Sequence, residues 1–360
     1  MIKKLLIAVV LFIAIATSAL YGAQSWVKGL LPEKSHFDAL KQTQTADLTY
    51  VTEDIPEYRG KILAVVTSVD SMGEDKATGY EHTELARAYW VFVANGFEVD
   101  FASPLGGKPP VVIDGEDMGK YDYAFLNDSE IQQRVDNSIP LAEIDPQDYE
   151  AVYYVGGKGT MFDFPDNPDI QRITKSLYQS GKVVSAVCHG PAALVNVTLD
   201  NNQSLLANKN VSSFTNEEEL LLIPDAESIF PFLLEDQIRS QGATFQPGLT
   251  YLEQVIQDGK LITGQNPWSV WKMAEMVVAE IGYTPKTRKR TPEEYSVDLL
   301  TTYKTHGYDA AILEMQQQPH EYQRILLLMH GMLAFMQWDP AAGIDLFMLT
   351  NTLKNMAESM

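Results

Sequence analysis

A single cysteine at the end of an apolar run carries the clearest chemical signal in the sequence. Residues 182–187 have the β-branched composition of a buried strand and lead directly into Cys188. Gly190 and Pro191 follow, and the residues after them favour a helix. A strand, a tight turn and a helix make a nucleophile elbow, which displays its central side chain at the carboxyl edge of a sheet. We therefore predict that Cys188 is a nucleophile, with a thiol pKa lowered by the N-terminus of the following helix.

Cys188 also admits a plainer interpretation. It is the only cysteine among 360 residues, so no internal disulfide can form and the thiol is either inert or reactive. A lone cysteine often serves simply as a small apolar side chain in a core. From the residue type alone, both interpretations stay open.

The apolar runs on either side of Cys188 predict the elements that would hold it. Helical patterns, as at residues 84–94 and 169–180, alternate with short runs that are typical of strands buried on both faces. These strand patterns lie at residues 61–67, 97–102, 151–155, 182–187 and 260–263. Strands that alternate with helices form right-handed crossovers around a parallel sheet. We therefore predict a doubly wound α/β fold with a mostly parallel sheet flanked by helices.

The composition changes on both sides of this region. Residues 24–59 are polar and aperiodic, which predicts a linker, and the α/β domain is expected over residues 60–284. Residues 285–360 open with a basic, exposed connector at 286–290 and continue with helical patterns. They predict a C-terminal helical extension that contains an antiparallel helix hairpin.

The first 23 residues predict export. Lys3 and Lys4 precede an almost unbroken apolar run at residues 5–23, which fits a signal peptide or a membrane anchor. The lysines favour an N-terminus that stays in the cytosol, so the rest of the chain would be periplasmic or otherwise extracytoplasmic. It would be soluble after cleavage, or tethered to the membrane through residues 5–23.

The overall charge narrows the range of partners. A net charge of −21 repels phosphate backbones and anionic lipid headgroups, so nucleic acid is not expected as a partner. Apolar residues make up 45% of the chain and charged residues 21%, as in folded globular proteins. A monomer and a homodimer both stay open as the assembly.

Seven stretches together resemble one family. The elbow reads AVCHGPAAL at residues 186–194, and six further motifs stand in the same order as in the ThiJ/PfpI superfamily, which has the class I glutamine-amidotransferase-like fold. These motifs are TGYEHTELA at 78–86, FASPLGG at 101–107, GGKGTMFD at 156–163, FTNEEE at 214–219, PFLLED at 231–236 and TGQNP at 263–267. The chain is most similar to the branch that contains glyoxalase III and heat-shock chaperones. The resemblance spans residues 60–282.

The resemblance implies catalytic roles for four side chains. Cys188 matches the family's nucleophile and His189 the histidine that follows it. Glu219 matches the acid that completes a Cys-His-Glu triad, and Glu84 matches a buried glutamate beside the thiol. Burial would raise the pKa of Glu84 and let it shuttle protons, whereas the local pattern alone makes it a solvated acid in the first turn of a helix.

The acids before Glu219 have a structural explanation. Thr215 or Asn216 would cap a helix that begins there, and Glu217 and Glu218 would complement its dipole. Of these three acids, the resemblance therefore gives a catalytic role only to Glu219.

A glycine-rich stretch supplies the expected oxyanion hole. We assign this role to the backbone N–H groups of Gly157, Lys158 and His189. Lys158 stands where the family has a histidine. The change preserves a backbone function and adds a cation that would lower the thiol pKa, but it removes any chemistry that the imidazole performs.

His82 is the remaining candidate for a residue that binds a metal ion. No second histidine stands at ligand spacing from it, so a surface position is expected for His82. Neither a metal nor a cofactor is expected.

Together these residues predict a cysteine-dependent enzyme that acts on a small aldehyde. The resemblance implies the glutathione-independent conversion of methylglyoxal or related aldehydes to hydroxy acids, with D-lactate as the product from methylglyoxal. The Cys188 thiolate would form a hemithioacetal, and Glu84 would relay a proton between adjacent carbons. Two alternatives stay open: a cysteine hydrolase or peptidase of the same fold, and a non-enzymatic stress chaperone that uses its apolar C-terminal helices.

Overall fold

The chain forms two compact units in a computed structural model that describes residues 24–73, 76–115, 118–318 and 321–359. One unit spans residues 40–291. The other contains the described residues before position 40 together with those from position 292 onward. The domain boundaries expected at residues 60 and 284 stay a prediction. The predicted leader at residues 1–23 lies outside the described residues.

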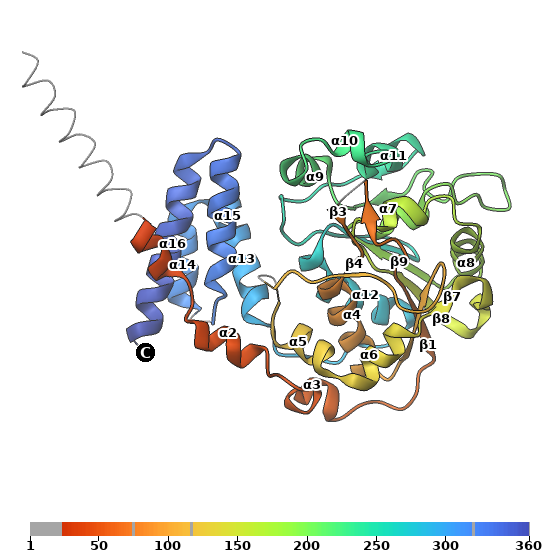
Figure 1. The fold of residues 1–360 in the computed structure, drawn as a ribbon, viewed down its shortest axis with the longest axis horizontal. Coiled ribbons are helices and arrows are strands. Elements are labelled where there is room, and N and C mark those ends of the chain that lie inside the picture. Colours follow the sequence, from red (N-terminus) through yellow and green to blue (C-terminus); the bar gives the residue numbers. More distant parts are fainter. Residues whose placement is uncertain (1–23, 74–75, 116–117, 319–320, 360) are drawn as a thin grey trace, which may run out of the picture. The chain divides into compact units, whose positions relative to one another are not determined.

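A seven-stranded sheet forms the centre of the unit 40–291 (Figure 1). Every neighbouring pair in it is parallel except β12 and β13, which pair antiparallel at one edge. The strand order is β12 (Val255–Asp258), β13 (Leu261–Gly264), β9 (Val183–Val187), β8 (Tyr149–Tyr154), β1 (Lys61–Val65), β5 (Glu98–Ser103) and β7 (Ile139–Pro140). The predicted mostly parallel sheet is confirmed.

Helices and short turns connect these strands. The α-helices of the same unit are α3 (Thr49–Thr52), α4 (His82–Ala94), α5 (Lys120–Asn127), α6 (Ser129–Asp136), α7 (Thr160–Asp163), α8 (Pro168–Gln179), α9 (Asn216–Leu222), α10 (Ala226–Ile229), α11 (Leu234–Ser240) and α12 (Val270–Ile281). Three two-stranded ribbons pair β2 (Ser71–Met72) with β3 (Lys76–Ala77), β4 (Tyr80–Glu81) with β6 (Val111–Val112), and β10 (Asn210–Val211) with β11 (Thr244–Phe245). The described helices and strands thus alternate as the sequence patterns predict.

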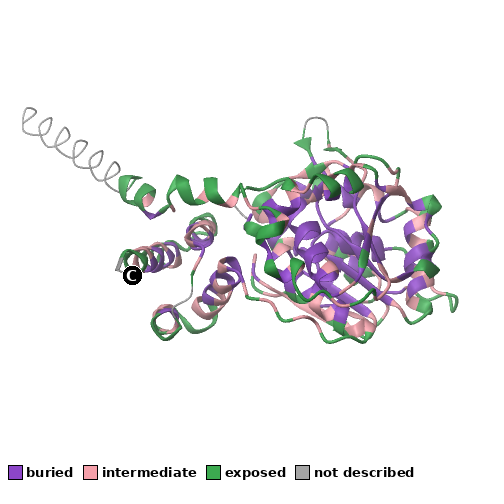
Figure 2. Ribbon diagram, turned by 90° about the horizontal axis from the view of Figure 1, so that it is seen from below, coloured by how far each residue is buried: buried purple, intermediate pink, exposed green. Residues whose placement is uncertain are grey.

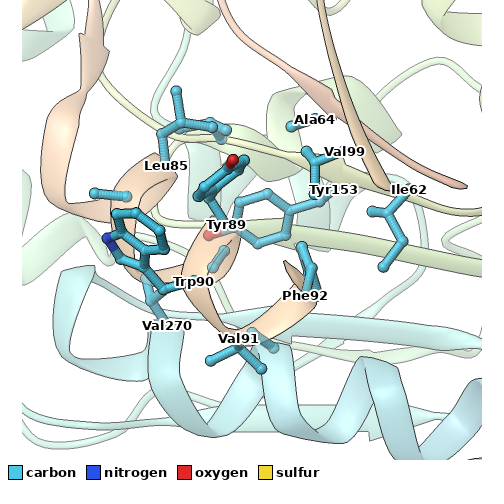
Figure 3. Packing of buried hydrophobic residues seen from close by; sticks show 14 of the residues in the cluster. Ile62, Ala64, Leu85, Tyr89, Trp90, Val91, Phe92, Val99, Tyr153 and Val270 are labelled. Atoms are coloured by element: carbon cyan, nitrogen blue, oxygen red, sulfur yellow. The ribbon is translucent and has the colours of Figure 1, made fainter. Parts of the chain in front are cut away.

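The two faces of the sheet enter separate cores because successive side chains of a strand point to opposite sides. In β1, Ile62 and Ala64 belong to one core, while Leu63 and Val65 belong to the other. Helices α4 and α12 cover the first core, where Trp90 packs among aliphatic and aromatic side chains (Figure 3). Helix α8 covers the second core. Buried residues therefore fill the sheet and the inner sides of its helices (Figure 2).

The linker expected at residues 24–59 stays a prediction, and the structure places short helices within it. It contains α2 (Lys34–Leu40), a 3-10 turn at Thr45–Asp47 and α3. Within the unit 40–291, Leu48 and Tyr50 are buried in the core that α4 covers. These scattered apolar residues anchor the polar segment to the core. Their spacing has no regular period, so an analysis of periodicity does not detect them.

The basic stretch at 286–290 is also less exposed than predicted. The Arg288 guanidinium lies 4.2 Å from the centre of the Trp271 ring, and its Nε donates to Glu275 at 2.9 Å. Lys286 donates to the backbone oxygen of Tyr50 at 2.8 Å. Long basic side chains can cover apolar surface while their charge is paired, so a run of charges does not by itself predict exposure.

The predicted C-terminal helical extension is confirmed. It consists of α13 (Pro292–His306), α14 (Tyr308–Gln317), α15 (Arg324–Met336) and α16 (Pro340–Ser359). Helices α15 and α16 pack against each other with the rings of Phe335 and Phe347 5.7 Å apart. A side chain at Gly331 would collide with Phe347, and one at Gly343 with Phe335, so these glycines make room for the two rings. Among the helices that the structure describes, none is long and apolar enough to cross a membrane.

A buried ion pair between α4 and α5 allows a test of the fold. Arg87 and Asp122 lie 3.2 Å apart, and both side chains are almost fully buried. We expect Arg87→Leu to lower the free energy of unfolding by about 3–5 kcal/mol, because it leaves the Asp122 carboxylate buried without its partner. Urea unfolding measures the change.

The matched control is Lys108→Met, which removes the exposed pair between Lys108 and Asp136. That change is expected to alter the stability by about 1 kcal/mol at most. Equal effects of the two substitutions would contradict a structural role for the buried pair.

Candidate active site

Cys188 occupies a strained backbone position directly after β9. Its φ is +58°, a region that residues other than glycine seldom adopt. Its N–H donates to Gly264 O at 2.9 Å, and its carbonyl accepts from Phe214 N at 2.8 Å. A side chain at Gly190 would collide with the Tyr154 carbonyl, so this position requires glycine. Backbone contacts on both sides therefore hold the cysteine in this conformation.

The strained turn brings two consecutive side chains together. The Cys188 Sγ lies 3.3 Å from His189 Nδ1, and His189 Nε2 lies 2.5 Å from Glu219 Oε2. The imidazole is buried and its ring centre is 4.5 Å from that of Phe214. Neighbouring side chains at an ordinary turn tend to diverge, so the positive φ is what permits this contact. The thiol, the imidazole and the carboxylate thus form a continuous chain of side-chain contacts.

Glu219 is an ionised acid at the end of this line. Burial raises its pKa, but the contact with His189 more than offsets burial and holds the pKa of the carboxyl below its ordinary value. Its Oε1 is buried and has no hydrogen-bond partner among the described residues. A charged carboxylate on Nε2 fixes the orientation of the ring and presents Nδ1 to the thiol.

The two acids before Glu219 are structural, as predicted. Thr215 is the N-cap of α9, and it forms a capping box with Glu218. Glu218 is buried and accepts from Tyr251 N at 2.7 Å, while Glu217 is exposed. Helix capping therefore orients Glu219 toward His189.

Glu84 lies beside the thiol and is completely buried in the first turn of α4. Its Oε2 accepts from Gly156 N at 2.8 Å, whereas Oε1 has no hydrogen-bond partner among the described residues. Burial, followed by the charge of Glu81, raises the pKa of Glu84 well above its ordinary value. Burial therefore favours the protonated form of this carboxyl group.

The structure contradicts the predicted lowering of the thiol pKa. Burial, followed by the charge of Glu84, raises the pKa of Cys188, and Lys158 only partly opposes this rise. The helix expected after the elbow is a single 3-10 turn at Gly190–Leu194, which has too few peptide dipoles to replace the lost solvation. The contribution of Glu84 disappears when Glu84 is protonated, so the two groups titrate as a coupled pair.

Three backbone N–H groups at the glycine turn and the elbow have no hydrogen-bond acceptor among the described residues. Within the described residues, those of Gly157, Lys158 and His189 donate to no acceptor. The Thr160 hydroxyl lies 2.9 Å from Gly157 O and 3.0 Å from His189 O, which joins the glycine turn to the elbow. Sequence reasoning missed Thr160 and Phe214 because a hydroxyl and a ring carry no signal until the turns meet.

The prediction that His82 lies on the surface is wrong. It is completely buried, its Nε2 lies 2.9 Å from Asp122 O, and burial lowers its pKa. In the described part of the chain, no group of three or more potential ligands could hold a metal ion. The contact with Asp122 O helps to fix α4 against α5.

Gly156 shows how tightly the site is packed. A Cβ atom there would collide with Glu84 Oε2 and lie 2.7 Å from Cys188 Cβ. We expect Gly156→Ala to lower the free energy of unfolding by about 1–3 kcal/mol, because the added methyl group must push both side chains aside. Gly115→Ala, where a Cβ meets only the Tyr123 hydroxyl at 4.0 Å, is the control and should have little effect. A neutral Gly156→Ala would show that the two side chains have room to move. Urea unfolding of both variants gives the comparison.

The raised thiol pKa can be measured directly because Cys188 is the only cysteine. We expect the midpoint of the pH dependence of iodoacetamide alkylation to lie higher in the native chain than in the chain unfolded in urea, where it should be about 8.5. Lys158→Met should move the native midpoint further upward, since Lys158 lowers the pKa of Cys188. A native midpoint at or below the unfolded one would restore the prediction of an activated thiolate.

Comparisons with known proteins agree with this geometry. The DJ-1/PfpI family model matches residues 76–280. Glyoxalase 3 of Candida albicans is 32% identical over 232 residues, which cover 61% of this chain and 97% of that protein. The glutathione-independent glyoxalase HSP31 of Saccharomyces cerevisiae is 30% identical, over 59% of this chain and 94% of that protein.

Two solved structures share the fold. The Rapid Encystment Protein 24 KDa of Francisella tularensis has a TM-score of 0.59 and 32% identity, and the match covers 62% of this chain and all of that one. Glyoxalase III of Candida albicans has a TM-score of 0.56 and 30% identity, and the match covers 62% of this chain and 98% of that one.

These findings contradict the predicted export and the predicted tether through residues 5–23. The matches to the two glyoxalases use 97% and 94% of their own lengths, so these relatives have almost no room for a leader. An apolar run after two lysines was therefore insufficient evidence for a location outside the cytoplasm.

The elbow, the buried glutamate and the sheet order come from different parts of the chain. All three lie within the unit 40–291, and the family model covers the elbow, Glu84 and every strand of the central sheet except β1. The chain belongs to the DJ-1/PfpI family.

Proposed function

We propose that this protein is a glutathione-independent glyoxalase that converts methylglyoxal, or a related small 2-oxoaldehyde, to the 2-hydroxy acid. The carrying observation is the buried Glu84, whose unpartnered Oε1 lies in the same buried site as the Cys188 thiol. A cysteine hydrolase needs the thiol, a base and an oxyanion hole, but it has no use for a second, protonated carboxyl group at the thiol. The names of the relatives support the same reaction.

The reaction begins with the transfer of the thiol proton to His189. Nδ1 is 3.3 Å from Sγ, and ionised Glu219 stabilises the imidazolium that forms. The thiolate attacks the aldehyde carbon, and Glu84 gives its proton to the resulting alkoxide. The product of this step is a hemithioacetal with Glu84 as a carboxylate.

Glu84 then relays a proton between the two carbons. Its carboxylate removes the hydrogen from C1, which leaves an enediolate, and returns it to C2. The C1 hydroxyl proton moves to the neighbouring C2 oxygen, so the intermediate becomes a 2-hydroxyacyl thioester on Cys188. The burial that raises the pKa of Glu84 also makes its carboxylate a stronger base.

Water completes the reaction by hydrolysing the thioester. Glu84 accepts a proton from the attacking water, and the departing thiolate recovers its own proton from His189. The backbone N–H groups of Gly157, Lys158 and His189 would stabilise the oxyanion. The atoms balance as one 2-oxoaldehyde and one water giving one hydroxy acid, with D-lactate from methylglyoxal.

Substitutions in the full chain test these roles, with methylglyoxal loss and D-lactate formation measured in the absence of glutathione. We expect Cys188→Ser and Glu84→Gln each to lower kcat/KM by about a thousandfold, since each group acts on the reacting atoms. The double variant should lose little more than the worse single one, because the two residues act as a unit. Glu219→Gln should lower kcat/KM by about ten- to a hundredfold, through a less basic His189.

Glu217→Gln is the matched control, because Glu217 is exposed and lies two residues before the triad acid Glu219. It should retain full activity. Wild-type protein that leaves methylglyoxal unchanged but hydrolyses simple esters would favour the hydrolase alternative. Turnover that survives Cys188→Ser would contradict the mechanism.

A further inference from the structure

Glu218 is a buried carboxylate with more hydrogen bonds than a helix cap requires. Its Oε2 accepts from the backbone N–H and the hydroxyl of Thr215 at 3.0 and 3.1 Å, within the capping box of α9. Its Oε1 accepts three further hydrogen bonds, from Tyr251 N at 2.7 Å, Gln265 Nε2 at 2.9 Å and Asn266 Nδ2 at 3.1 Å. Burial raises the pKa of Glu218, and these hydrogen bonds oppose the rise. Because both oxygens accept, the group has no place for a proton of its own and is ionised.

Two of the donors on Oε1 come from the segment that also holds the cysteine. Gln265 and Asn266 directly follow Gly264, whose carbonyl accepts from Cys188 N at 2.9 Å. Both residues are completely buried, so their side chains are held in place by packing as well as by hydrogen bonds. Glu218 is therefore tied, through the two residues after β13, to the carbonyl that fixes the backbone of the nucleophile.

Tyr251 holds Glu218 at a second point. Besides its N–H on Oε1, its hydroxyl donates to Glu218 O at 2.5 Å, so the side chain and the carbonyl of Glu218 are both fixed. The centre of the Tyr251 ring lies 6.0 Å from that of Phe214, which in turn lies 4.5 Å from that of His189. Glu219 is the next residue in the chain, and its Oε2 is 2.5 Å from His189 Nε2. The place of the triad acid thus depends on the residue before it.

We propose that Glu218 is a positioning residue of the triad, which joins the first turn of α9 to the segment after β13 and so holds Glu219 against His189. This inference rests on the proposed function, in which ionised Glu219 stabilises the imidazolium. Capping alone does not explain the arrangement, because Oε2 serves the cap and the donors on Oε1 belong to another part of the chain. An action through charge would have the opposite sign: the charge of Glu218 raises the pKa of Cys188, so its removal alone would favour the thiolate.

A double-mutant cycle tests whether Glu218 acts through Glu219, with kcat/KM for methylglyoxal measured in the full chain. We expect Glu218→Gln to lower kcat/KM by about tenfold in the wild-type background, because an amide group cannot accept all five hydrogen bonds. In the Glu219→Gln background the same change should cost about twofold at most, because the residue that Glu218 positions has then lost its charge. Equal losses in the two backgrounds, no loss in either, or a gain in rate would overturn the positioning role.

Two further variants separate positioning from a general loss of stability. Asp128→Ala removes the N-cap of α6, a helix that carries no triad residue, and should lower the stability in urea while kcat/KM stays unchanged. A loss of activity in Asp128→Ala as large as that in Glu218→Gln would overturn the inference. Tyr251→Phe removes only the hydroxyl on Glu218 O, and it decides the question if Glu218→Gln does not fold. It should lower kcat/KM by about threefold in the wild-type background and cause no further loss beside Glu219→Gln; equal losses would overturn the inference.

A proton NMR signal tests the same contact without turnover. The proton between His189 Nε2 and Glu219 Oε2 is buried, and the 2.5 Å distance predicts a resonance downfield of the backbone amides, which Glu219→Gln should remove. We expect Glu218→Gln to move this resonance upfield, as for a longer hydrogen bond, and Asp128→Ala to leave it in place. A wild-type spectrum without the resonance, or no shift in Glu218→Gln, would overturn the inference. Wild-type protein that converts no methylglyoxal would overturn the proposed function instead, and the resonance would still decide the role of Glu218.

Discussion

The positive φ of Cys188 is the constraint on which the rest of the site depends. At +58° the backbone lets a cysteine and the next residue place their side chains within 3.3 Å of each other. Such a conformation costs of order 1–3 kcal/mol and persists only where the surroundings enforce it. Here β13 supplies Gly264 O, the segment before α9 supplies Phe214 N, and Tyr154 O leaves no space for a side chain at Gly190.

Burial of acidic groups is the second organising feature, and it has two different results. Asp122 is buried as an ion, because Arg87 lies 3.2 Å away and is buried with it. Glu84 is buried in the first turn of α4, where the N–H of Gly156 donates to one of its oxygens and the other oxygen has no partner among the described residues. The first arrangement serves stability. The second keeps a proton available beside a thiol, which suits chemistry on adjacent carbons.

Tight packing links these features. Gly156 stands between Glu84 and Cys188, and no side chain fits there without displacing one of them. Gly157 and Thr160 then join the glycine turn to the elbow through the carbonyl of His189. The nucleophile, the buried acid and the backbone donors are therefore held by one set of contacts, and a change in any of them reaches the others.

The sequence by itself determined the alternation of strands and helices, the elbow at Cys188 and the candidate acids, because periodicity, glycines and motif order are local properties. Only the tertiary structure decided the electrostatics. It buried His82, reversed the expected shift of the thiol pKa, and shortened the helix after the elbow to a 3-10 turn. Solvation and pairing depend on residues far apart in the chain, so a sequence pattern names the groups without fixing their charges.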